Sequence, residues 1–137
     1  MIQIKNVSKW YGPVQVLNDC TVNIGKGDVV VVCGPSGSGK STLIKTVNAL
    51  EPYQKGEIIV NGISLSDDRT NLPQLRSKVG MVFQHFELFP HLSVTENLTL
   101  AQVRVLGRSS DEAKTRGLKM LDRVGLSRSA RLLFSAA

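Results

Sequence analysis

The sequence has no long hydrophobic run. None of its apolar stretches approaches the roughly 18 residues that a membrane-spanning helix requires. The residues after Met1 alternate between polar and apolar types, which is not the basic and then apolar pattern of a signal peptide. We therefore expect the chain to stay in the cytoplasm.

Cysteine, aromatic residues and clustered basic residues are also scarce. Cys20 and Cys33 lack the spacing of metal ligands and lie among apolar neighbours, so both are expected to be small core residues without a disulfide. Aromatic residues make up 5% of the chain, and its net charge of +6 is spread without a Lys/Arg run. Because nucleic-acid-binding chains gather basic and aromatic residues on one surface, we expect no nucleic-acid partner.

What is present is the composition and patterning of one α/β domain. Hydrophobic residues make up 42% of the 137 positions, which is enough for a core of its own. Alternating residues at 2–7 and 14–24 predict two antiparallel strands. The unbroken apolar run at 29–33 is typical of a parallel strand covered on both faces. Helical spacing follows at 40–50.

Further along, short strands are followed by helices. Residues 57–65 predict a hairpin around Asn61-Gly62, the pair favoured in type I′ turns, and residues 79–83 predict another short buried strand.

Two Ser-x-x-Glu capping boxes then predict the starts of two helices. They are formed by Ser93 with Glu96 and by Ser109 with Glu112, and Gly125 is placed to end the second helix.

A glycine-rich segment lies between the predicted strand at 29–33 and the predicted helix at 40–50. It fits the P-loop pattern G-x-x-x-x-G-K-[ST] in the strand–loop–helix context that the motif requires. Its residues are Gly34, Pro35, Ser36, Gly37, Ser38, Gly39, Lys40, Ser41 and Thr42. A glycine-rich turn that only resembles a P-loop would need neither the strand nor the helix.

The chemistry of this segment suits a nucleotide. Glycines let the backbone fold closely around phosphate oxygens, so that N–H groups and the positive end of the following helix point at the anion. Lys40 is expected to reach the β- and γ-phosphates, Ser41 to offer its hydroxyl to Mg²⁺, and Thr42 to add a donor. The sequence therefore predicts binding of a nucleotide with Mg²⁺.

Kinases, GTPases and ABC ATPases share the P-loop, so other residues must decide between them. Three further segments resemble ABC-transporter ATP-binding subunits, and the resemblance extends to about Leu126. The segments are Lys9-Trp10-Tyr11-Gly12, Gly80-Met81-Val82-Phe83-Gln84, and Phe86-Glu87-Leu88-Phe89-Pro90-His91-Leu92 followed by Glu96-Asn97. These residues are most similar to those of the polar amino-acid importers, and within them to the subunits that serve glutamate and aspartate import. The resemblance therefore implies glutamate or aspartate as cargo.

The resemblance implies roles for residues outside the P-loop. Tyr11 would stack on adenine, and Gln84, as the Q-loop glutamine, would reach Mg²⁺ and sense the membrane partner. The region from Phe86 to Leu92 would receive a helix of the permease. Taken without the resemblance, Tyr11 could be a surface aromatic at a turn and Gln84 a polar strand cap. His85 and His91 are six residues apart, which suits neither a metal site nor a general base.

The resemblance also implies an architecture and an assembly. Residues 1–92 would form an incomplete ATP-binding core and residues 93–126 the start of a helical subdomain, with a divergent tail at 127–137. Complete relatives would pair as homodimers around two ATP molecules, peripheral on the inner face of the plasma membrane. There they would drive a pair of permease chains and depend indirectly on a periplasmic binding protein.

Three family features are missing from the 137 residues: an apolar strand ending in Asp-Glu (Walker B), an LSGGQ loop and the switch histidine. No catalytic residue is therefore assigned. We expect a truncated ABC-type ATPase that binds nucleotide but is deficient in hydrolysis, with open sheet edges and uncovered apolar surface.

Two other functions stay open on the sequence alone. A small P-loop kinase would need a lid with arginines, for which Arg104, Arg108 and Arg116 are the loose candidates. A nucleotide-binding remnant without a transport role would differ only in not assembling with a permease.

Overall fold

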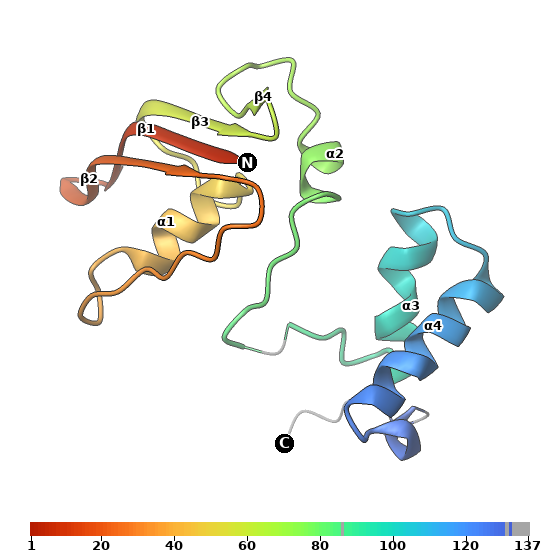
Figure 1. The fold of residues 1–137 in the computed structure, drawn as a ribbon. Coiled ribbons are helices and arrows are strands. Elements are labelled where there is room, and N and C mark those ends of the chain that lie inside the picture. Colours follow the sequence, from red (N-terminus) through yellow and green to blue (C-terminus); the bar gives the residue numbers. More distant parts are fainter. Residues whose placement is uncertain (86, 131, 133–137) are drawn as a thin grey trace. The chain divides into compact units, whose positions relative to one another are not determined.

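The structure is a computed structural model that describes residues 1–85, 87–130 and 132 (Figure 1). The chain forms two compact units, Met1–Gly80 and Met81–Ala137. Phe86 and most of the expected divergent tail, at 131 and 133–137, lie outside the described residues. In the part that is described, no helix has the length and apolar character needed to cross a bilayer.

The first unit contains a four-stranded antiparallel sheet in the order β2-β1-β3-β4 (Figure 1). Its strands are β1 (Ile2–Tyr11), β2 (Val14–Ile24), β3 (Lys55–Val60) and β4 (Ile63–Ser64). The predicted pairing of the first two segments is confirmed, and so is the hairpin. Asn61 and Gly62 have φ values of 49° and 80°, the positive values that a type I′ turn requires at both positions.

The sheet and two helices enclose the core of this unit. Buried residues of the sheet and of the short helix α2 (Leu72–Arg76) form its centre: Ile4, Val7, Leu17, Ile58, Val60 and Leu75. Leu43 and Val47 of helix α1 (Lys40–Val47) pack against it. The helix ends earlier than the predicted residue 50 because Ala49 has a φ of 56°, which a right-handed helix does not allow.

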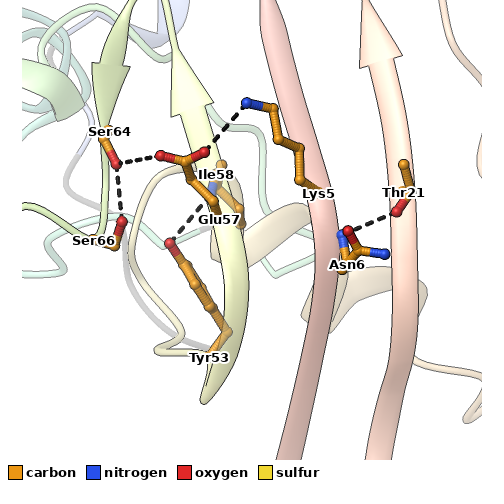
Figure 2. A network of polar contacts seen from close by, with 8 residues as sticks. All are labelled: Lys5, Asn6, Thr21, Tyr53, Glu57, Ile58, Ser64 and Ser66. Atoms are coloured by element: carbon orange, nitrogen blue, oxygen red, sulfur yellow. Dashed lines mark hydrogen bonds and ion pairs between the residues drawn. The ribbon is translucent and has the colours of Figure 1, made fainter.

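Polar side chains tie the four strands together across the sheet (Figure 2). Lys5 of β1 forms an ion pair with Glu57 of β3 at 3.2 Å, and the Ser64 hydroxyl of β4 donates to the same carboxylate at 3.3 Å. On the other side of β1, the Asn6 N–H donates to the Thr21 hydroxyl of β2 at 2.9 Å. The Asn6 contact replaces a backbone ladder bond where the register of β1 and β2 shifts.

The predicted strands at 29–33 and 79–83 are wrong. Neither segment is a strand, and the side chains of Val29 and Val82 are 92% and 98% exposed. A buried parallel strand needs hydrogen-bonded neighbours on both sides, and no described residue pairs with either segment. The valines therefore present the uncovered apolar surface that the sequence led us to expect. Cys33 is likewise exposed instead of being a core residue, whereas Cys20 packs partly buried against the core.

The second unit contains helices α3 (Val94–Arg104) and α4 (Ser110–Arg123) and the 3₁₀ turn η1 (Ser127–Ser129). The capping box of Ser93 and Glu96 at the start of α3 is confirmed. At the start of α4 the Ser109 hydroxyl accepts from the Glu112 N–H. The Glu112 carboxylate instead lies 3.7 Å from Arg108 Nε and 3.2 Å from Arg116 Nε, so the second box is only half formed.

Candidate nucleotide site

The glycine-rich segment runs from the end of the apolar run into helix α1 and lies against strand β2. Gly37 and Gly39 have φ values of 80° and 86°. Gly39 is the N-cap of α1, and its carbonyl accepts from the Leu43 N–H at 2.8 Å. A Cβ atom on Gly39 would lie 2.8 Å from the Val16 carbonyl oxygen and 3.1 Å from a methyl of Leu17. The absence of a side chain at position 39 therefore lets the loop pack directly on β2.

The start of α1 offers main-chain donors to an anion. The N–H groups of the first helical turn have no intrahelical partner in any α-helix, and here they belong to Lys40, Ser41 and Thr42. A serine or aspartate at the N-cap would accept from them, but Gly39 has no side chain to do so. These donors and the positive end of the helix dipole can therefore act on a bound phosphate.

Lys40 closes the loop with its own ammonium. The Lys40 Nζ donates to the carbonyl oxygens of Gly34 and Pro35 at 2.8 and 2.6 Å, and it lies 3.5 Å from the Ser38 hydroxyl. The Ser38 N–H turns back to the Pro35 carbonyl at 3.3 Å. The positive charge thus lies across the loop on neutral acceptors, which phosphate oxygens can replace with stronger, charge-assisted bonds.

The hydroxyl groups of this turn are the candidate ligands for a metal. Ser41 is exposed at the second position of α1, and its hydroxyl has no hydrogen-bond partner among residues 1–85, 87–130 and 132. Hydroxyl oxygen is a hard ligand of the kind that Mg²⁺ accepts beside phosphate oxygens. Over the same described ranges, no three His, Cys, Asp or Glu residues come together as a metal site.

Tyr11 lies in the same unit as the glycine-rich loop and close to it along the sheet. Tyr11 is the last residue of β1 and pairs with Val14 of β2. Val14 is two residues, or roughly 7 Å of extended strand, from Val16, whose carbonyl oxygen lies close to Gly39. Its side chain is 46% exposed. The structure therefore brings Tyr11 and the loop onto the same pair of strands.

Two residues that the sequence analysis did not single out surround Tyr11. The Lys9 side chain is 2% exposed, and its ammonium lies 4.2 Å from the centre of the Tyr11 ring. The same ammonium donates to the Pro52 carbonyl at 2.6 Å and lies 3.3 Å from the Glu51 carboxylate. A hydrogen bond from the Tyr11 hydroxyl, followed by the bond and charge of Lys9, holds the pKa of Glu51 below its ordinary value. Only the two-residue spacing of Lys9 and Tyr11, which places both on one face of a strand, could have indicated this contact.

Gln84 and the region after it belong to the second unit. Gln84 is exposed in a bend, and Leu88 and Phe89 are exposed further on. Asn97 of α3 holds this segment: its amide oxygen accepts from the Phe89 N–H at 2.8 Å, and its amide nitrogen donates to the carbonyls of Phe89 and Leu92 at 3.1 and 3.2 Å. Asn97 therefore holds the backbone at Phe89 and Leu92, next to the exposed side chains of Leu88 and Phe89.

The histidines flanking this segment do not form a metal site in the described residues. The ring of His91 meets that of Phe89 edge to face at 5.9 Å between centroids. His91 therefore packs on an aromatic neighbour.

Comparisons with known proteins identify the family of this chain. A family model described as ABC transporter matches residues 17–135. The chain is 69% identical over 127 residues to a glutamate/aspartate import ATP-binding protein of Escherichia coli (strain K12), covering 93% of this chain and 53% of that protein. It is 46% identical over 130 residues to a glutamine transport ATP-binding protein of the same strain, covering 95% of this chain and 54% of that protein.

Solved structures show the same fold. A bacterial ABC transporter cassette solved as a dimer has a TM-score of 0.89 and 34% identity, with 97% of this chain and 61% of that chain covered. A dimeric post-hydrolysis ATP-binding cassette bound to ADP and Pi has a TM-score of 0.87, with the same identity and coverage. The chain spans about half the length of the curated relatives it matches.

Proposed function

Because the chain belongs to the ABC transporter family, we propose that it binds Mg-ATP as the nucleotide-binding part of an ATP-binding subunit that powers amino-acid import. The observation that carries this proposal is the loop at 34–42, which lies on β2 with unpaired first-turn N–H groups and the Lys40 ammonium across it. This is an arrangement of donors that only an anion with several oxygens can use fully.

Each part of the nucleotide has a candidate partner. The main-chain N–H groups of residues 34–42 and Lys40 would hold the β- and γ-phosphates, with Thr42 as a further donor. Ser41 would supply a hydroxyl to Mg²⁺, and the Gln84 amide oxygen would be its second protein ligand. The exposed ring of Tyr11 would stack on adenine, because every purine offers a π-face to an aromatic side chain.

The proposed cargo is glutamate or aspartate. The relative at 69% identity is named as a glutamate/aspartate importer, whereas the glutamine transporter stands at 46%. In the proposed assembly the chain would pair with a second copy and contact the permease on the inner face of the membrane through residues 86–92. A periplasmic binding protein and the permease would select the amino acid.

The 137 residues on their own are proposed to bind ATP with little turnover. Hydrolysis needs a group that positions water against the γ-phosphate and balances the developing charge, and no residue in the sequence is assigned to that role. A second candidate, a nucleotide-binding remnant without a transport role, differs from the first only in not assembling with a permease. Co-purification with permease subunits would separate the two.

The kinase alternative loses its support. Arg108 and Arg116 both pair with Glu112 along the surface of α4. Arg104 has no such ion pair among the described residues, and it is the match of residues 17–135 to the ABC transporter family that disfavours a kinase.

Titration calorimetry with Mg-ATP tests the proposed site. Replacing Lys40 by Ala removes a charge-assisted contact with the phosphates, so the affinity is expected to fall by about 10- to 100-fold. The matched control is Lys26→Ala, which removes the same charge from an exposed position outside the loop and is expected to bind as the parent does. Equal affinities of all three proteins would contradict the phosphate site. Hydrolysis that disappears with Lys40→Ala would contradict the expected low turnover.

A further inference from the structure

The buried ammonium of Lys9 is the feature that the proposed function leaves unused. Lysine is almost never fully buried unless its charge is paired, yet the Lys9 side chain is 2% exposed. Its partners are the Glu51 carboxylate, the Pro52 carbonyl and the face of the Tyr11 ring. These three contacts offset the free energy of burying the charge, and one of them is the face of an aromatic side chain.

Tyr11 is restrained from two directions by this group. The Lys9 ammonium lies against one face of its ring at 4.2 Å, where the ring quadrupole attracts a cation more strongly after desolvation than in water. The Tyr11 hydroxyl is the largest cause that holds the pKa of Glu51 below its ordinary value, and the Glu51 carboxylate also lies 3.3 Å from the Lys9 ammonium. The ammonium on the ring face restrains the rotation of the ring about the long axis of the side chain, and the carboxylate restrains where the hydroxyl end lies, so the opposite face of the ring keeps a single orientation.

Glu51 is itself anchored to the helix that begins at the glycine-rich loop. The Glu51 N–H donates to the Lys45 carbonyl of α1 at 3.2 Å. The backbone next to Tyr11 is also held, because the Gln54 side chain accepts from the Trp10 N–H at 2.9 Å and donates to the Trp10 carbonyl at 3.2 Å. The end of β1 is thus connected to helix α1 through Glu51 and to the segment that follows α1 through Gln54.

We propose that Lys9 and Glu51 are a pair of positioning residues that hold the Tyr11 ring ready to stack on a purine base, an inference that rests on the proposed nucleotide site. A ring that is already fixed loses no side-chain freedom when the base binds, which would otherwise weaken the complex. The pair acts through Tyr11 only, so it contributes to the affinity for the base and not for the phosphates.

The experiment compares two ligands on the full chain by calorimetry, Mg-ATP and inorganic tripolyphosphate with Mg²⁺. Lys9→Met keeps the length of the side chain and removes its charge. It is expected to weaken ATP by about two- to tenfold, the effect of ordering one side chain, and to leave tripolyphosphate unchanged. The matched control is Lys55→Met, which removes the cation that lies 5.6 Å from the Trp10 ring and is expected to change neither affinity.

A double variant shows whether the effect passes through Tyr11. In a Tyr11→Leu background, where the stacking ring is absent, Lys9→Met is expected to cause no further loss of ATP affinity. If Lys9→Met does not fold, Glu51→Gln carries the same comparison, because it removes the charge that pairs with Lys9 from a partly exposed position and keeps an acceptor for the buried ammonium.

The possible failures are distinguishable. Equal loss of ATP and tripolyphosphate affinity, or full additivity with Tyr11→Leu, would overturn the positioning role while leaving the nucleotide site in place. Failure of the parent chain to bind either ligand would overturn the proposed function itself.

Discussion

Replacing Gly39 by Ala introduces two unfavourable contributions to the folding free energy, both of which glycine avoids in the loop at 34–42. Gly39 has a φ of 86°, a conformation that costs an L-residue about 1–2 kcal/mol. In addition, its new Cβ would lie 2.8 Å from the Val16 carbonyl oxygen, a backbone atom that cannot rotate away. Forcing the loop off β2 adds about 1–3 kcal/mol, as overpacking typically does.

Gly37→Ala is the matched control for this prediction. Gly37 has a φ of 80°, but no heavy atom lies within 4 Å of the position of its Cβ. It therefore carries the conformational cost alone, about 1–2 kcal/mol, whereas Gly39→Ala is expected to lose about 2–5 kcal/mol in total.

The assay is urea unfolding followed by the fluorescence of Trp10. This is the single tryptophan of the chain, and it lies in β1, in the same sheet as the strand that Gly39 contacts. Equal losses in unfolding free energy for the two variants would refute the reasoning, because they would show that the loop does not rest on β2.

Two further predictions concern the second unit. Asn97→Ala removes the side chain that bonds to the backbone of Phe89 and Leu92. Hydrogen exchange at the Phe89 amide is therefore expected to become about tenfold faster, in line with the loss of the hydrogen bond that this amide donates. Unchanged exchange would show that Asn97 does not hold this segment. The bonds from the hydroxyl and N–H of Ser93 hold the pKa of Glu96 below its ordinary value, so their stabilisation is present above the unfolded pKa and is lost as the pH falls through the folded pKa. Thermal unfolding between pH 7 and 3 is therefore expected to show a larger loss of stability for the parent than for Glu96→Gln, and parallel losses would contradict this.

The sequence predicted the elements whose signals are local. The type I′ turn at Asn61-Gly62 and the capping box at Ser93 depend on residues that touch each other within four positions, so their geometry follows from residue type. Alternation likewise placed β1 and β2, although it did not indicate that Val7, Ser8 and Lys9 are all buried where the register of β1 shifts. Helix α2 was missed because five residues with Pro73 near the start carry no periodic signal.

The errors arose where a structure depends on distant neighbours. The run of valines at 29–32 indicates a segment apolar enough to be buried in a sheet. It does not indicate whether neighbouring strands are present to cover it, and here the valines are exposed. The contact of Lys9 with Tyr11 and Glu51 was missed for the same reason, because a lysine in a strand ordinarily extends into solvent and Glu51 is 42 positions away. The sequence motif alone predicted the phosphate loop. The contacts that hold Tyr11 depend instead on the packing of residues that are far apart in the sequence.

The central claim is that the backbone between Gly34 and Thr42 receives the phosphates of a nucleotide. It is tested most directly by following the amide signals of the uniformly ¹⁵N-labelled chain by nuclear magnetic resonance as Mg-ATP is added. We expect the amide signals of the loop and of Tyr11 to change position in proportion to the fraction of chain that has bound nucleotide. The changes in the loop signals are expected to recur with tripolyphosphate. A well-folded chain in which these amides stay fixed at millimolar nucleotide would contradict the account.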